Sequence, residues 1–105
     1  MKFTCLREDI LSAVMKAEKA VSPKSTLAVM EGILIEAEID KVYISGNDLE
    51  IAIEASFQAR VERTGRIVLN SRMFTDIIRK TGHGTVFFHT NEKNVATISS
   101  GMSRG

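Results

Sequence analysis

The sequence contains few of the residues that cross-link or interrupt a chain. Its 105 residues include one cysteine, one proline and no tryptophan. A single cysteine excludes an intrachain disulfide and a cysteine-based zinc cluster. It is consistent with a reducing compartment such as the cytoplasm. We interpret Cys5 as a small hydrophobic residue of the first strand rather than as a reactive thiol.

The chain also lacks an excess of either charge and any long apolar run. The net charge is +1, so the total charge indicates no particular partner, although charge can still be segregated between two faces. No stretch approaches the ~18 apolar residues of a membrane span, and MKFTCLREDI has no apolar segment typical of a secretion signal. We therefore expect one soluble, cytoplasmic domain with no membrane partner.

Two segments, residues 7–21 and 70–84, repeat apolar residues with the period of an amphipathic helix. Asn70 or Ser71 is expected to cap the second helix. The residues expected to face the core from the two helices are Ile10, Leu11, Val14, Met15 and Val21, and then Met73, Phe74, Ile77 and Ile78.

Elsewhere apolar and polar residues alternate, as in strands that bury one face. In ILIEAEI (33–39), Ile33, Ile35, Ala37 and Ile39 are expected to point inward. The expected strands cover residues 2–5, 33–39, 41–45, 49–61, 66–69, 85–90 and 94–99. The order β-α-β-β-β-β-α-β-β predicts an α+β fold, in which two amphipathic helices pack on one face of an antiparallel sheet.

Three carboxylates in ISGNDLEIAIEA, Asp48, Glu50 and Glu54, are candidates for a metal or acid–base site. The alternation places them on the outer face of a half-buried strand. An open sheet face cannot desolvate a carboxylate as a catalytic pair requires. A divalent cation would need more oxygen ligands than these. We therefore predict a solvated face with no catalytic residue, no metal and no cofactor.

Two histidines, His83 and His89, lie six residues apart without a second cluster of potential ligands. We interpret both as solvated or structural residues. A small enzyme that uses Asp48, Glu50 and one of these histidines remains the weakest of three functional hypotheses.

Charge is distributed unevenly between the expected helices and strands. Residues 7–24 and 71–81 contain seven basic and four acidic residues, whereas residues 28–69 contain four basic and eight acidic residues. A positive helical layer would attract phosphate without reading bases. Lysine-rich helix surfaces also occur for solubility alone, so charge by itself does not decide between the two.

Four stretches occur together and in one order: MKFTC at the start, KSTLAVMEGILIEA at 24–37, SGNDLEI at 45–51 and IVLNSRMFTDIIRK at 67–80. Through them the whole chain resembles the first domain of a bacterial sliding clamp, the β subunit of DNA polymerase III. The resemblance implies the DNA-clamp fold. It also implies a non-catalytic processivity factor, because members of this family form head-to-tail homodimeric rings around duplex DNA and tether the polymerase.

The same resemblance implies candidate DNA-binding residues. Lys24 and Arg72 match family positions that contact the phosphate backbone, and Arg79 and Lys80 are further candidates at the end of the second helix. Weaker candidates, chosen from their helix face, are Arg7, Lys16 and Lys19. The partners implied for the full-length family are non-specific duplex DNA, DNA polymerase III and the clamp loader. The family's peptide pocket lies in later domains.

The chain departs from the family in two ways. Ala28 and Met30 stand where the family has a Leu-Pro pair and an aliphatic residue, and Gly105 stands where an aromatic residue is expected. A full clamp chain has three such domains, so residues 1–105 are expected to form domain 1 alone, truncated before its closing strand. The exposed edge at NVATIS (94–99) would then mediate any dimer of this chain, and that dimer would not use the clamp's own interface. The alternative is a free-standing interaction or oligomerisation domain with no nucleic-acid role.

Overall fold

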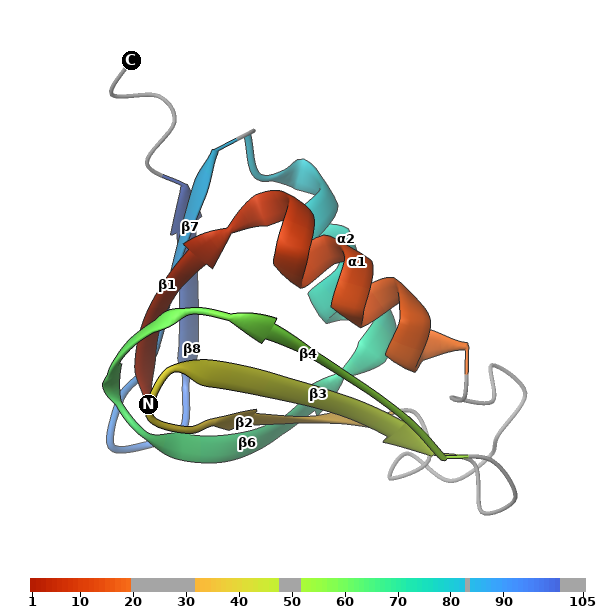
Figure 1. The fold of residues 1–105 in the computed structure, drawn as a ribbon, viewed down its shortest axis with the longest axis horizontal. Helices are drawn as coiled ribbons and strands as arrows, with labels where there is room; N and C mark the ends of the chain where they lie inside the picture. Colours follow the sequence, from red (N-terminus) through yellow and green to blue (C-terminus); the bar gives the residue numbers. More distant parts are fainter. Residues whose placement is uncertain (20–31, 48–51, 83, 101–105) are drawn as a thin grey trace.

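The computed structural model describes residues 1–19, 32–47, 52–82 and 84–100 (Figure 1). Within these ranges the chain forms ten elements, in which runs of consecutive strands are separated by only two helices, as in an α+β fold. They are β1 (Lys2–Leu6), α1 (Arg7–Glu18), β2 (Gly32–Ala37), β3 (Lys41–Asn47), β4 (Ala52–Gln58), β5 (Arg60–Arg63), β6 (Gly65–Asn70), α2 (Ser71–Lys80), β7 (Thr85–Thr90) and β8 (Ala96–Ser100).

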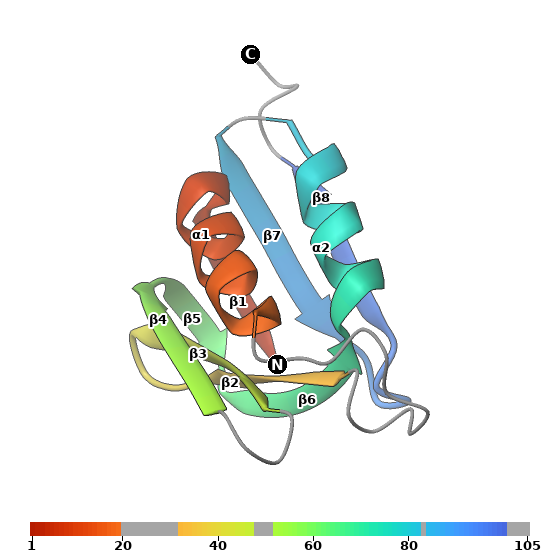
Figure 2. The same ribbon diagram turned by 90° about the vertical axis from the view of Figure 1, so that its right-hand side faces the viewer.

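The strands form two antiparallel four-stranded sheets, with the orders β5-β1-β7-β8 and β4-β3-β2-β6. The two sheets meet at an angle, and both helices lie inside that angle (Figure 1). Figure 2 shows α1 and α2 side by side, in front of β7 and β8 and above the sheet that contains β2, β3, β4 and β6, in agreement with the contacts between the two helices. The helices therefore cover the inner sheet faces and leave the outer faces exposed. No helix in the described ranges is long and apolar enough to cross a membrane.

The core lies between the helices and both sheets. Phe3 on β1 stacks on Phe88 of β7, with ring centroids 4.8 Å apart, and Phe74 of α2 meets the Phe88 ring edge-on at 6.1 Å. Ile35 and Ile44, which are paired across β2 and β3, are fully buried. This burial of alternating and helical apolar residues supplies the main driving force for the fold.

The predicted α+β fold is confirmed, but the prediction of one sheet and seven strands is wrong in detail. Residues 49–61 were expected to form one strand, whereas β4 ends at Gln58 and β5 begins at Arg60 in the other sheet. At the junction, the Ala59 N–H donates to the Asp40 carbonyl oxygen at 3.1 Å. The alternation of inward side chains continues through this junction, so the sequence pattern contains no signal that the strand changes sheets.

Four residues predicted to face the core are exposed: Ile39, Met15, Met73 and Ile77. Ile39 is 86% exposed because β2 ends at Ala37, and the chain then turns, with the Glu38 N–H donating to the Lys41 carbonyl oxygen at 2.8 Å. The other three lie on helix flanks, where the covered stripe is narrower than expected. The prediction for Val21 lies outside the described residues.

Cys5 is buried in β1, so its predicted role as a small hydrophobic residue is confirmed. Burial, and to a lesser extent the Asp9 carboxylate, raise the pKa of the Cys5 thiol to about 12. The reactive thiolate is therefore disfavoured at neutral pH.

Candidate nucleic-acid interface

The sequence of α2 defines both of its ends. Asn70 is the N-cap, and its side-chain Oδ1 accepts a hydrogen bond from the Met73 N–H at 2.9 Å. At the other end, the N–H and the hydroxyl of Thr81 both donate to the Ile78 carbonyl oxygen, at 3.2 and 2.6 Å. Arg79 and Lys80 occupy the last turn, where positive charge complements the helix dipole.

One side of α2 is buried and the other carries the candidate residues. Phe74, Thr75 and Ile78 face the core, whereas Arg72, Arg79 and Lys80 are exposed. Arg72 and Arg79 are seven residues apart, so they share a stripe and are separated by about 10 Å along the helix axis. Asp76 is also exposed and lies between them along the helix. The exposed stripe is therefore basic, with one carboxylate within it.

The positive charge of the described helices belongs to α2. This helix has three basic residues and one acidic residue, Asp76. In contrast, α1 has two basic residues, Arg7 and Lys16, against Glu8, Asp9 and Glu18. Phosphate would therefore be attracted mainly to α2 rather than equally to both helices.

Contacts with α1 hold α2 at its middle and at its C-terminal end. In the middle of α2, the Thr75 hydroxyl donates to the Glu18 carboxylate at 2.7 Å, and its oxygen also lies 2.9 Å from the Ser71 carbonyl oxygen. Near its end, the Arg7 guanidinium donates from Nη2 to the Arg79 carbonyl oxygen at 3.1 Å. The helix that carries the basic stripe is therefore held in place by its contacts with α1.

Comparisons with known proteins agree with this arrangement. Residues 1–104 match the family described as DNA polymerase III beta subunit, N-terminal domain. The chain belongs to this family. The beta sliding clamp of Staphylococcus epidermidis is 36% identical over 111 aligned residues, as is that of Staphylococcus aureus. The alignments cover 98% of this chain and 29% of each of those proteins.

Solved structures show the same relationship. The DNA polymerase sliding clamp from Bacillus subtilis superposes with a TM-score of 0.91 at 32% identity, over 96% of this chain and 29% of that one. The sliding clamp from Caulobacter crescentus gives a TM-score of 0.90 at 26% identity, over 96% of this chain and 28% of that one. This beta-subunit domain thus spans less than a third of the length of the relatives that it matches.

The structure describes three of the four predicted DNA-binding residues of this beta-subunit domain. Arg72, Arg79 and Lys80 lie together on the exposed side of α2. Lys24 lies outside the described residues. Sequence reasoning did not identify the contact of Arg7 with the end of α2, because no local pattern links residues 72 positions apart. Of the weaker candidates, Lys16 and Lys19 are exposed on and just after α1.

The outer faces of the sheets carry ion pairs instead of a basic stripe. Glu36 on β2 lies 3.7 Å from Arg66 on β6, and Lys2 on β1 lies 3.4 Å from Glu62 on β5. Glu54 is exposed on β4, in agreement with its predicted place on a solvated face. Asp48, Glu50 and His83 fall outside the described residues. His89 is exposed on β7.

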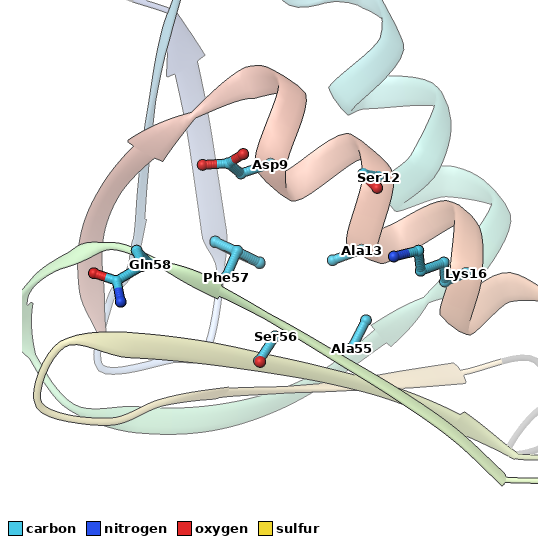
Figure 3. Close-up of a pocket in the computed structure, with 8 residues that line it drawn as sticks. All are labelled: Asp9, Ser12, Ala13, Lys16, Ala55, Ser56, Phe57 and Gln58. Atoms are coloured by element: carbon cyan, nitrogen blue, oxygen red, sulfur yellow. The ribbon is translucent and has the colours of Figure 1, made fainter.

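A pocket lies between α1 and the edge strand β4 (Figure 3). Ala55 and Phe57 point from β4 toward α1, and Ser56 points to the opposite face (Figure 3). The pocket is lined by Asp9, Ser12, Ala13, Lys16, Ala55, Ser56, Phe57 and Gln58. This lining has one carboxylate and no histidine, so it does not provide the groups that the enzyme hypothesis requires. Among the described residues, no three His, Cys, Asp or Glu side chains are grouped as metal ligands.

Proposed function

We propose that this chain acts as the DNA-facing first domain of a sliding clamp. In that role the ring encircles duplex DNA and tethers DNA polymerase III in the cytoplasm, without catalysing a reaction itself. Family membership supports the role, and the exposed stripe Arg72, Arg79 and Lys80 is the observation that carries it to this chain's own surface. Because the chain spans 29% of its relatives, the activity of the ring belongs to the proposal.

The chemistry of the stripe suits a protein that slides. Long basic side chains on an exposed helix reach phosphates and carry no information about base sequence. Contacts of this kind are screened by salt, and Asp76 weakens them further by repelling phosphate. We expect the isolated domain to bind duplex DNA at or more weakly than the usual non-specific range of about 10⁻⁴–10⁻⁶ M.

Ring assembly is the second part of the proposal. The strand β8 is the last of its sheet, and we expect any dimer of the isolated chain to pair through this backbone edge rather than through the interface of the ring. Apolar side chains on the exposed flank of α2, Met73 and Ile77, are 64% and 39% exposed and suit contact with a protein surface. Binding of DNA polymerase III and the clamp loader is assigned to the full-length family rather than to this domain.

Substitution of the basic stripe tests DNA binding. In Arg79→Ala and Arg72→Ala, affinity for a short duplex should fall, and the slope of log K against log salt should decrease by about 0.9 for each phosphate that the variant no longer neutralises. Asp76→Asn should increase affinity, because it removes a like charge between the two arginines. Affinity is measured by fluorescence anisotropy at several salt concentrations.

Arg66→Ala is the matched control, because it removes the same charge from an outer sheet face. It should leave the salt slope nearly unchanged. If Arg66→Ala reduces the slope as much as Arg79→Ala does, binding is a response to net charge and the helical face has no special role. If the parent chain binds no duplex at low salt, the alternative of an interaction domain without a nucleic-acid role takes precedence.

A further inference from the structure

Arg7 joins the start of α1 to the end of α2. It is the first residue of α1, and its backbone N–H donates to the Gly84 carbonyl oxygen at 2.8 Å. Its guanidinium Nη2 donates to the Arg79 carbonyl oxygen at 3.1 Å. One arginine therefore contacts the chain on both sides of the turn that follows α2.

The Arg79 carbonyl is a group that needs such a partner. The last four carbonyl oxygens of a helix have no N–H partner within the helix. The Thr81 N–H and hydroxyl both donate to the carbonyl oxygen of Ile78, the residue before Arg79, so they leave the Arg79 carbonyl oxygen without a partner from Thr81. A guanidinium at this position satisfies the Arg79 carbonyl and also places a positive charge at the negative end of the helix dipole.

The surroundings of Arg7 do not suit a direct phosphate contact. Its Nε atom is buried and has no hydrogen-bond partner, and the side chain as a whole is only partly exposed. No described carboxylate lies within ion-pair distance of it. Because the Nε atom is buried, it is not available to a phosphate oxygen.

We propose that Arg7 is a positioning residue for the candidate DNA contacts, fixing the last turn of α2 so that Arg79 and Lys80 project from a rigid support. This inference rests on the proposed function and extends it, because it assigns to Arg7 a role that acts through other residues. It replaces the expectation that Arg7 itself contacts the phosphate backbone.

Nuclear magnetic resonance of the arginine Nε–H groups distinguishes the two roles in one sample. A short duplex is added to the parent chain at low salt. The Nε–H signal of Arg79 should shift, whereas that of Arg7 should be protected from solvent exchange and should stay nearly fixed. A shift of the Arg7 signal as large as that of Arg79 would identify a direct contact and overturn the proposal.

A double-mutant cycle tests whether Arg7 acts through α2. Arg7→Met keeps most of the apolar stem and removes the donor and the charge. It should weaken duplex binding about two- to five-fold in the parent, but should have no further effect in an Arg79→Ala/Lys80→Ala background, which retains the Arg79 carbonyl. An equal loss in both backgrounds would mean that Arg7 binds DNA independently. Arg66→Met, on the outer sheet face, is the control with the same change in charge.

Amide exchange in the DNA-free protein adds a second readout. In Arg7→Met the amides of Arg79, Lys80 and Thr81 should exchange about two- to ten-fold faster, because the last turn of α2 loses a cap. If Arg7→Met does not fold, Arg7→Lys replaces it. Lysine keeps the charge but ends short of the Nη2 position, so a smaller change of the same kind is expected. Parent-like exchange and binding in the folded variant would overturn the proposal.

Failure of the two proposals can be told apart. If no arginine signal of the parent shifts with DNA, the proposed function fails, and the positioning role fails with it. If Arg79 and Lys80 respond in the parent and the response survives unchanged in Arg7→Met, only the positioning role is overturned.

Discussion

At the residue scale, the exposed side of α2 combines attraction and repulsion. Arg72 and Arg79 flank Asp76 on one stripe, so the local electrostatic potential is positive, but the Asp76 carboxylate reduces it. A uniformly basic stripe would bind phosphate more strongly and would release it more slowly. Under the proposed function, weak contacts with individual phosphates would be sufficient, because closure of the proposed ring would prevent dissociation.

Cys5 provides a pH-dependent prediction at the same scale. Its thiol has a pKa of about 12 in the folded chain, compared with 9.0 as the ordinary value. The folded state therefore holds this proton more tightly than the unfolded state. The contribution to stability is complete below pH 9 and is lost as the pH rises toward 12, at a slope of at most about 1.4 kcal/mol per pH unit.

Urea unfolding of the parent and of Cys5→Ala between about pH 7 and pH 11 measures this contribution. The alanine variant controls for lysine and tyrosine groups that titrate in the same range. The parent should lose stability relative to Cys5→Ala above the ordinary thiol pKa of 9.0. A constant difference between the two proteins across the range would contradict the assignment.

At the element scale, the N-terminus of α2 allows a comparison of two adjacent residues. Asn70→Ala removes the cap of the Met73 N–H and should lower the free energy of unfolding by about 1 kcal/mol. Ser71→Ala removes a buried hydroxyl that has no hydrogen-bond partner, so it should change stability by less than about 0.5 kcal/mol or increase it.

Urea titrations followed by circular dichroism compare these two variants. Both lie at the same helix end, so each controls for general disturbance there. A Ser71→Ala variant that is as destabilised as Asn70→Ala would show that the Ser71 hydroxyl has a stabilising contact.

The elements differ in how far the sequence predicted them. The start of α2 was predicted correctly, because Asn70 and the apolar residues Phe74 and Ile78 combine a cap signal with a helical period. The end of β4 was not predicted, because transfer of the chain to a second sheet at Ala59 leaves the period of two unbroken. Local periodicity reports which face a residue occupies, but not which sheet its strand joins.

The candidate site shows the same division. Positive charge and a helical period place Arg72, Arg79 and Lys80 on one exposed surface, so their grouping was predictable. The exposed flank formed by Met73 and Ile77 was not, because an apolar residue at a helical spacing looks the same whether it faces the core or a partner protein. The role of Arg7 depends on a contact between distant segments, which a single sequence does not encode locally.

At the scale of the whole molecule, the fold separates two surfaces. The helices fill the angle between the two sheets, so the side that carries α2 and the outer sheet faces point in different directions (Figures 1 and 2). Ion pairs such as Glu36–Arg66 neutralise charge on the outer faces, while α2 keeps an excess of positive charge. This separation allows one surface to meet DNA and the others to meet solvent or protein.

The most direct test of the central claim is a titration of the chain with a short DNA duplex, observed by nuclear magnetic resonance at low salt and repeated at higher salt. If α2 is the DNA-facing surface, amide shifts should appear along its exposed side, at Arg72, Arg79 and Lys80, and should disappear as salt increases. Shifts confined to the outer sheet faces, or no shifts at low salt, would contradict the claim that α2 forms the DNA-facing surface.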